Sequence, residues 1–161
     1  VEMGVEVEEQ DDALLIRRNG PISRVNVKTM PYPGFPTDMQ PQIAAVLCLA
    51  RGTSVLTEGV WENRYRYVDE FRRMGAQIQV DGKVAVIEGV EALTGAPVHA
   101  CDLRAVAAMV IAGLAAQGVT EIDSIHHIER GYETLVEKLA AVGAEIQTVT
   151  VPDEESQPQV G

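Results

Sequence analysis

Two aspartates and three arginines are the residues of this 161-residue chain whose types and spacing could do chemistry. Asp38 precedes Arg64, Asp102 precedes Arg130, and Arg104 adds a third cation. A guanidinium group binds phosphate or carboxylate through paired hydrogen bonds. A carboxylate held nearby can act as a base. These residues therefore suit a small ligand that carries both phosphate and carboxylate, with an aspartate beside it.

Each of these residues also has a structural explanation, and the residues alone leave it open. Asp38 falls in the first turn of an expected helix, where the helix dipole favours a carboxylate. Arg64 lies near Glu62, and Arg130 follows Glu129, so each arginine could form a structural ion pair. A turn before a helix nevertheless favours Ser, Thr, Asp or Asn, so the scaffold does not require arginine at both places.

The stretch PYPGFP leads directly to this region, and its composition fixes the backbone. Each proline restricts φ and pushes the preceding residue towards extended conformations, while the glycine permits a tight bend. We therefore expect a loop with one fixed shape. Thr37 stands three residues before Gln40, which predicts a capping box at the start of the following helix.

Hydrophobic alternation, helical spacing and turn residues predict the elements around these positions. The expected elements are a hairpin over 4–18, a strand near 25–27, a helix over 38–50, a strand over 53–57, a loop over 58–64, a helix over 67–74, a hairpin over 76–87, a strand over 98–100, a helix over 102–116, a strand over 119–122, a loop over 126–131, a helix over 132–142 and a strand over 144–151. This mixture predicts an α/β fold.

The order strand, helix, strand, helix, strand, strand recurs with a shift of about 65 residues, which indicates an internal duplication. The aligned pairs are Asp38 with Asp102, Gly52 with Gly118, Arg64 with Arg130, and Gly75 with Gly143. A third, truncated copy is indicated at the start, where Gly4 aligns with Gly75. We therefore expect a piece of a longer protein. Its parts would be a hairpin and strand over 1–30, a first complete unit over 31–97, a second unit over 98–151 and a mobile acidic tail over 152–161.

The charge balance argues against polyanionic partners. The chain has 13 Lys and Arg against 24 Asp and Glu, a formal net charge of −11 at pH 7. Such a charge repels nucleic acid and anionic membrane surfaces. The excess is concentrated at the two ends, so a local arginine pocket in the near-neutral body can still hold an anion. We expect neither a nucleic-acid nor a membrane partner.

The sequence indicates no metal or cofactor site. Cys48 and Cys101 give no disulfide framework. The three histidines, His99, His126 and His127, lack metal-ligand spacing with either cysteine. Cys101 precedes an expected helix start, where a thiolate could be stabilised, but a small buried residue is the favoured explanation, and we assign neither cysteine a catalytic role. The chain shows no signal peptide and no long apolar run. We expect a cytoplasmic protein without a metal ion or organic cofactor.

Four motifs, PYPGFPTDMQ, GVWENR, DLRA and HIERGYE, closely resemble the bacterial UDP-N-acetylglucosamine enolpyruvyl (1-carboxyvinyl) transferases. The resemblance runs from Gly4 to about Val149. It implies an inside-out α/β barrel built of repeated βαβαββ units, with helices inside and sheets outside. This chain would be the C-terminal portion, with two complete units and the tail of a third. The related 5-enolpyruvylshikimate-3-phosphate synthase shares that fold and is the weaker match.

The resemblance also implies an activity. The family transfers the enolpyruvyl group of phosphoenolpyruvate to the 3′-hydroxyl of UDP-N-acetylglucosamine and releases phosphate. This reaction is the first committed step of peptidoglycan synthesis, and so serves cell-wall biogenesis, cell shape and cell division. Asp38 matches the family's candidate general base near the 3′-hydroxyl, and Val60 matches a position that contacts the UDP-sugar. Trp61 stands where phenylalanine is usual.

The arginines match the family's phosphoenolpyruvate side. Arg64, Arg104 and Arg130 would hold the carboxylate and phosphate and stabilise charge in the tetrahedral intermediate. Asp102 matches an acid beside Arg104 that would orient the site. Arg104 and Arg130 would therefore count, with Asp38, as catalytic residues.

The family's proton-donating cysteine loop and its N-terminal lysine have no counterpart in this chain. We therefore expect the chain to need the missing N-terminal portion of the same enzyme and to be inactive alone. An exposed sheet edge in the truncated unit could also pair with a second copy. The alternatives from other classes are a non-catalytic anion- or nucleotide-binding module and a structural repeat protein with Asp–Arg ion pairs.

Overall fold

The computed structural model describes residues 2–129 and 131–150. Its elements in chain order are β1 (Glu6–Glu9), β2 (Leu14–Arg17), β3 (Val27–Lys28), the 3₁₀ helix η1 (Thr37–Met39), α1 (Gln40–Leu47), β4 (Thr53–Thr57), α2 (Val68–Arg73), β5 (Gln77–Asp81), β6 (Val84–Glu88), β7 (Pro97–His99), α3 (Leu103–Ala115), β8 (Glu121–Asp123), α4 (His126–Glu129) and α5 (Leu135–Ala141). No helix among these residues is long and apolar enough to cross a membrane.

Three strands of the first unit form a four-stranded mixed sheet with β3, which lies just before the boundary expected at residue 31. Its strand order is β3-β4-β6-β5, in which β3 and β4 are parallel and the other pairs are antiparallel. Side chains of β6 alternate between the two faces, so that Ala85 and Ile87 are buried while Val86 is exposed. The sheet therefore lays one face on the helices and leaves the other open to solvent.

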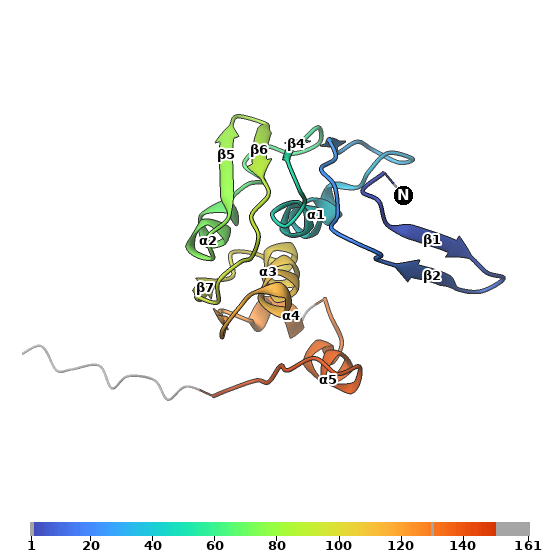
Figure 1. Cartoon of the computed structure of the whole chain (residues 1–161). Helices are drawn as coiled ribbons and strands as arrows, with labels where there is room; N and C mark the ends of the chain where they lie inside the picture. The colour runs from blue at the N-terminus through green and yellow to red at the C-terminus, as the bar shows by residue number, and fades with distance from the viewer. Residues whose placement is uncertain (1, 130, 151–161) are drawn as a thin grey trace, which may run out of the picture.

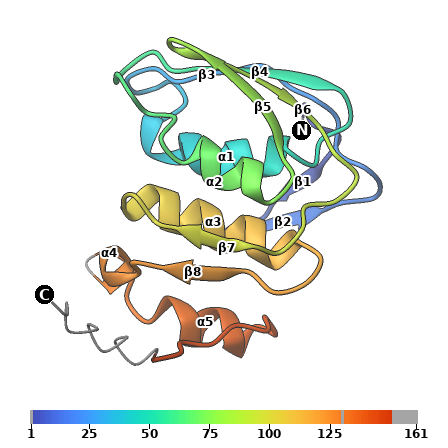
Figure 2. The ribbon, with the colours of Figure 1, turned by 90° about the vertical axis from the view of Figure 1, so that its left-hand side faces the viewer.

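Helices α1 and α3 form the centre of the molecule. They pack against each other, and β8 lies against α3. From the four-stranded sheet, the layers continue through α1 and α2 to α3, and then to the parallel β7–β8 pair and α5 (Figure 2). This packing brings the starts of two helices from different parts of the sequence close together.

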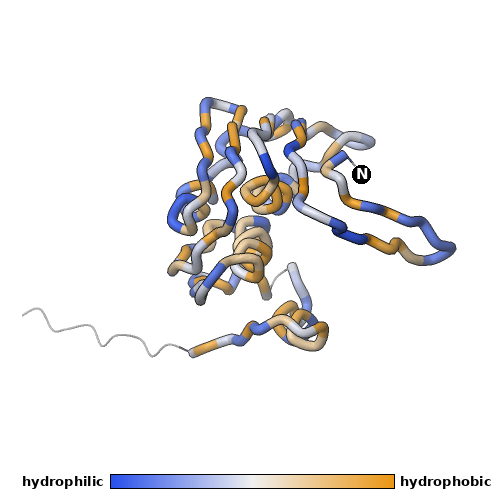
Figure 3. Tube along the Cα trace, in the orientation of Figure 1, coloured by the Kyte–Doolittle hydropathy of each residue, from blue (hydrophilic) through white to orange (hydrophobic). Residues whose placement is uncertain are grey.

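The core is aliphatic, as the composition predicts. Every residue of α3 from Ala105 to Val110 is buried, which is typical of a helix enclosed on all sides. Helices α1 and α3 are coloured mainly in shades of orange in Figure 3, as expected of apolar segments. Phe71 of α2 and Leu56 of β4 are fully buried and join α1 to the sheet. Because α3 is buried in the core, its N-terminal end has a fixed position.

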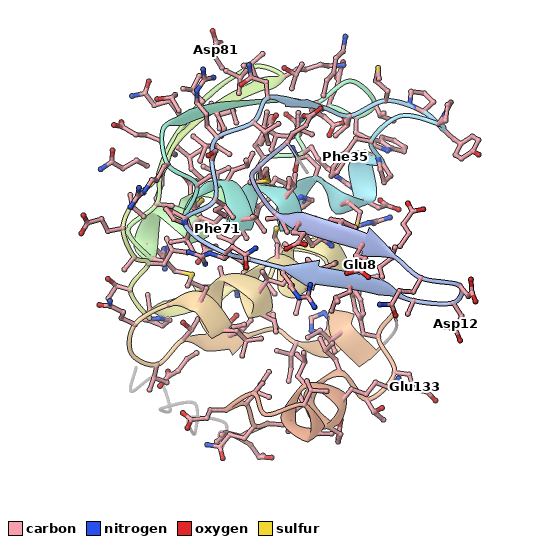
Figure 4. All side chains as sticks on the ribbon, turned by 45° about the vertical axis from the view of Figure 1, so that its right-hand side comes forward. Glu8, Asp12, Phe35, Phe71, Asp81 and Glu133 are labelled. Carbon is pink, nitrogen blue, oxygen red and sulfur yellow. The ribbon has the colours of Figure 1, made fainter. Side chains whose placement is uncertain are left out.

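The β1–β2 hairpin projects from this body (Figure 1). Its strands pair antiparallel with Val7 opposite Ile16, and nearly all of its residues are exposed. Asp12 marks its tip, pointing away from the rest of the chain (Figure 4). The hairpin expected over 4–18 is confirmed.

Most of the expected elements are confirmed within two or three residues, including the strand over 53–57 and the second hairpin. Two are wrong. The loop expected over 126–131 contains the helix α4, and residues 144–150 of the expected last strand are not in a strand. In the described residues, the second unit therefore shows the strand–helix–strand part of the first and a following helix, α5, without the closing hairpin. The expected mobile tail over 152–161 and Val151 lie outside the described residues.

One glycine position has the same backbone conformation in all three expected copies. Gly4, Gly75 and Gly143 adopt φ values of 81°, 89° and 98°, a region that residues with a Cβ rarely enter. After Gly4 and Gly75 the chain enters a hairpin, whereas after Gly143 it does not. The turn is thus the same in each copy, while the strands that follow it differ.

Candidate functional site

Asp38 is presented by a loop that closes on itself. The backbone N–H of Met30 donates to the carbonyl of Phe35, and that of Gly34 donates to Pro31, each at 2.9 Å. A Cβ on Gly34 would lie 2.6 Å from the Cβ of Met30, so the bend has no room for a larger residue. Figure 4 shows Phe35 where this loop meets the start of α1. The loop therefore delivers Asp38, in η1, to a fixed place.

Two arginines meet on a single oxygen of Asp38. Nη2 of Arg64 lies 2.9 Å from Oδ1, and Nε of Arg104 lies 2.8 Å from the same atom. Nη2 of Arg64 also donates to the carbonyl of Thr37 at 3.4 Å. Arg64 reaches the site from the loop after β4, and Arg104 from the first turn of α3. The structure thus brings together three of the residues that the sequence singled out.

The arginines keep Asp38 ionised. The hydrogen bond from Arg104 lowers the pKa of Asp38, partial burial opposes it, and the positive charges of Arg104 and Arg64 lower it further. The net effect places the pKa below its ordinary value of 3.8. At neutral pH, Asp38 is therefore a carboxylate that can accept a proton.

Part of this cluster's hydrogen-bonding capacity is unused. Within the described part of the chain, Oδ2 of Asp38 has no hydrogen-bond partner, and the side chain of Arg104 donates only through Nε. The two terminal nitrogens of Arg104 can therefore hold a planar anion. The Arg64 side chain is only 15% exposed, against 39% for Arg104, so Arg104 is the more accessible cation.

Asp102 caps helix α3. Its Oδ1 accepts hydrogen bonds from the backbone N–H groups of Arg104 at 2.8 Å and of Ala105 at 3.0 Å. This satisfies two N–H groups at the helix start and fixes the direction in which Arg104 leaves it. Cys101 precedes the cap, and burial, followed by the charge of Asp102, raises the pKa of its thiol. The thiolate considered from the sequence is therefore disfavoured.

The expected capping box at Thr37 is wrong. The hydroxyl of Thr37 donates instead to Oε2 of Glu58 at 3.0 Å, and no side chain caps η1 or α1. Oε1 of Glu58 accepts from the backbone N–H groups of Val60 and Trp61. The Thr37 hydroxyl therefore bonds to Glu58 and not to the backbone at the start of the helix. Through these bonds, Glu58 joins the loop of Asp38 to the loop of Arg64.

Glu58 is the residue of this region that sequence reasoning missed. It stands between an alternating strand and Gly59, where a charged residue ordinarily marks the solvated end of a strand. Its side chain is only 1% exposed. Nothing in the sequence distinguishes it from an exposed glutamate, because its burial depends on the path of a loop more than twenty residues earlier.

Val60 and Trp61 lie on the same loop as Arg64, with their side chains 38% and 59% exposed. Arg130 lies outside the described residues. The next residue, Gly131, packs closely on Leu103, where an added Cβ would be 2.5 Å from Cδ2. Gly131 therefore lies beside Leu103, the first residue of α3.

Comparison with known proteins identifies the family of this α/β chain, which carries the Asp–Arg cluster. A family model described as EPSP synthase (3-phosphoshikimate 1-carboxyvinyltransferase) matches residues 1–139. The chain therefore belongs to the EPSP synthase family of enolpyruvyl transferases.

Its curated relatives carry one more specific name. UDP-N-acetylglucosamine 1-carboxyvinyltransferase 3 of Caldanaerobacter subterraneus subsp. tengcongensis is 60% identical over 91% of this chain and 35% of the relative. A UDP-N-acetylglucosamine 1-carboxyvinyltransferase of Desulfofundulus thermocisternus is 55% identical over 90% of the chain and 60% of the relative. The chain thus spans between about a third and three fifths of these relatives. The resemblance expected from the four motifs is confirmed.

Solved structures agree with the fold. The enolpyruvyl transferase NikO from Streptomyces tendae superposes with a TM-score of 0.86 at 34% identity, over 94% of this chain and 35% of that protein. An EPSP synthase from Acinetobacter baumannii superposes with a TM-score of 0.62 at 22% identity, over 92% of this chain and 35% of that protein, which supports the fold alone. The expected α/β architecture is confirmed at this level.

Proposed function

We propose that this chain is part of an enzyme that transfers the enolpyruvyl group of phosphoenolpyruvate to the 3′-hydroxyl of UDP-N-acetylglucosamine, with release of phosphate. The observation that carries the proposal is the convergence of Arg64 and Arg104 on Asp38. This cluster combines a carboxylate base with cations for an anionic substrate. The names of the curated relatives support the choice of substrates.

Asp38 is proposed as the base for the sugar hydroxyl. Its Oδ2 takes the proton while the hydroxyl oxygen bonds to C2 of phosphoenolpyruvate and C3 gains a proton. The tetrahedral adduct then loses phosphate from C2 and a proton from C3, which restores the carbon–carbon double bond. The groups that exchange the C3 proton are proposed to lie in the remainder of the enzyme, where the resemblance places a cysteine loop and a lysine.

Arg104 and Arg64 are proposed to bind the carboxylate and phosphate of phosphoenolpyruvate, together with Arg130. An arriving anion competes with Asp38 for the guanidinium hydrogen bonds. Because those bonds lower the pKa of Asp38, their loss makes the carboxylate a stronger base. Substrate binding would therefore activate Asp38 when the hydroxyl is in place. Asp102 orients Arg104 through the helix cap, and Val60 is proposed to contact the UDP-sugar.

Phosphate release from phosphoenolpyruvate and UDP-N-acetylglucosamine tests the proposal. The chain alone is expected to be inactive, and the chain combined with the remainder of the enzyme is expected to turn over. Release of phosphate by the chain alone would contradict the proposed need for a second part. Binding of UDP-N-acetylglucosamine without turnover in the combined enzyme would favour a non-catalytic nucleotide-binding module, and turnover with shikimate 3-phosphate would favour the related synthase.

A further inference from the structure

A buried hydrogen-bond cluster lies behind the Asp–Arg site and has no role in the proposal above. It consists of Glu58, Thr29, Thr37, Gly59 and the backbone of Val60 and Trp61. Glu58 follows β4 with 1% of its surface exposed, and Thr29, after β3, is fully buried. A buried carboxylate is costly unless hydrogen bonds compensate for its lost hydration, so the partners of Glu58 determine whether this arrangement is stable.

Each oxygen of Glu58 serves a different segment. Oε2 accepts from the Thr37 hydroxyl at 3.0 Å, one residue before Asp38. Oε1 accepts from Val60 N–H at 2.8 Å and Trp61 N–H at 3.0 Å, at the start of the loop that carries Arg64. One side chain thus joins the segment of the base to the segment of a cation.

The backbone next to Glu58 leaves little freedom for another arrangement. Gly59 donates its N–H to Oγ1 of Thr29 at 2.8 Å. A Cβ on Gly59 would lie 2.2 Å from the carbonyl oxygen of Thr29, which is too close for any other residue without a shift of the backbone. The close approach of these two segments therefore holds Glu58 in place beneath Thr37.

The carboxylate form of Glu58 is the one these contacts require. Burial raises the pKa of Glu58, but hydrogen bonds from Thr29, Trp61, Val60 and Thr37 outweigh it and hold the pKa below its ordinary value of 4.5. Thr37, Val60 and Trp61 donate directly to its two oxygens. Glu58 therefore serves as a permanent acceptor and has no proton to give at neutral pH.

We propose that Glu58 is a positioning residue of the transferase site. It acts through Thr37, holding Asp38 in register with Arg64 and Arg104. Thr37 is suited to this role because its hydroxyl is bound by Glu58 while its carbonyl accepts from Arg64. The proposal rests on the proposed function, since it assigns Glu58 to the reaction in which Asp38 is the base.

Thr37→Val tests this role with less damage than a change at Glu58. Glu58→Ala would leave buried N–H groups without an acceptor and is expected to destabilise the fold itself. Thr37→Val keeps the side-chain shape and removes only the link to Glu58. Thr37→Ser restores the hydroxyl. Thr57→Val is the matched control, because Thr57 is also half-buried and its hydroxyl makes no hydrogen bond within the described residues.

The first measurement is the titration of the Asp38 carboxyl in this chain by ¹³C NMR. Thr37→Val is expected to move the Asp38 pKa up towards the ordinary value of a carboxyl, because the arginine hydrogen bonds weaken. Thr37→Ser and Thr57→Val are expected to leave it unchanged. An Asp38 titration that does not move in Thr37→Val would overturn the proposal.

The second measurement is steady-state kinetics in the complete enzyme. Thr37→Val is expected to lower kcat on the order of 10- to 100-fold with a smaller change in KM, because misplacement of a reacting group costs rate more than binding. Thr37→Ser is expected to recover the activity. A kcat that stays at the wild-type value in Thr37→Val also overturns the proposal. If wild-type enzyme releases no phosphate, the proposed function fails, while the titration still decides whether Glu58 positions Asp38.

Discussion

Asp38 and Arg104 are 66 residues apart in the sequence, yet Nε of Arg104 donates a 2.8 Å hydrogen bond to Oδ1 of Asp38. The two residues stand at the starts of two helix segments, and the packing of α1 on α3 brings those starts together. In the alignment of the two units, Asp38 corresponds to Asp102. One aspartate is therefore used as a site carboxylate and its counterpart as a helix cap.

Asp38→Asn is expected to abolish most of the turnover. The amide cannot take up the hydroxyl proton, and positioned proton transfer is typically worth about 10²–10⁴-fold in rate. Because the Asp38 side chain is 60% exposed, the unfolding temperature should change little. Phosphate release in the complete enzyme and thermal unfolding measure the two effects, with Asp81→Asn as a control on an exposed aspartate. Near-normal turnover would show that Asp38 is not the base.

Arg104→Ala is expected to lower turnover. It should also raise the pKa of Asp38, because the hydrogen bond from Arg104 is the strongest of the interactions that lower this pKa. Arg104→Lys should restore the charge but only part of the rate, because an ammonium group lacks the planar fork of a guanidinium. Kinetics with varied phosphoenolpyruvate provides the measurement. The control is Arg51→Ala. Arg51 is exposed and lies beyond the C-terminal end of α1, whereas Asp38 precedes its N-terminal end. Full activity of Arg104→Ala with a loss of fold stability would instead support a structural ion pair.

Asp102→Ala is expected to reduce the free energy of unfolding by about 1 kcal/mol, the usual cost of losing a helix N-cap. Asp102→Ser should retain most of the stability because serine also caps helices well. Urea unfolding of this chain measures the difference, and Asp81→Ala controls for the lost charge. Equal stability of the Asp102→Ala and Asp81→Ala variants would mean that the cap contributes nothing.

The free energy of unfolding should fall when the solution becomes acidic, in part because of Glu58. Its pKa in the folded chain lies below the ordinary value of 4.5. Glu58 therefore stabilises the fold above that value, and its contribution is lost as the pH falls through the lowered pKa. Urea unfolding between about pH 6 and pH 3 should show a shallower loss for Glu58→Gln than for wild type. Parallel curves would contradict this linkage.

The β1–β2 hairpin is expected to mediate self-association. Both outer edges of this two-stranded sheet lack a partner strand among the described residues, and Leu14 and Ile16 are 61% and 63% exposed. Open edges pair readily with other strands, although the acidic residues of β1 oppose it. Sedimentation velocity should reveal a dimer at high protein concentration that Leu14→Lys weakens. A single monomer species at every concentration would exclude such pairing.

Local patterns predicted most strands and both hairpins well. The strand over 53–57 and the two hairpins were correct because alternation and turn residues determine such elements locally. Residue types and the recurrence of an Asp and an Arg in each unit singled out Asp38, Arg64 and Arg104 as members of one site. The sequence could therefore indicate the members of the site before their geometry was known.

Contacts between distant loops decided what the sequence could not predict. The spacing of Thr37 and Gln40 fits a capping box, but Glu58 offers Thr37 a buried charged acceptor, and that tertiary bond prevails. The region after Gly143 repeats the turn of Gly75 without its hairpin. A strand forms only where a neighbour can satisfy its backbone, and none lies beside 144–150 among the described residues.

The two arginines of the site differ in how freely they can respond to a ligand. Arg64 is almost enclosed, and its Nε is buried without a partner among the described residues, whereas Arg104 stands at the rim with more than a third of its side chain in solvent. We expect the Arg64 side chain to keep its position and the Arg104 side chain to move when a ligand binds. Differences in the size of an anionic ligand would then be accommodated on the Arg104 side, so variation that retunes selectivity should accumulate around the start of α3.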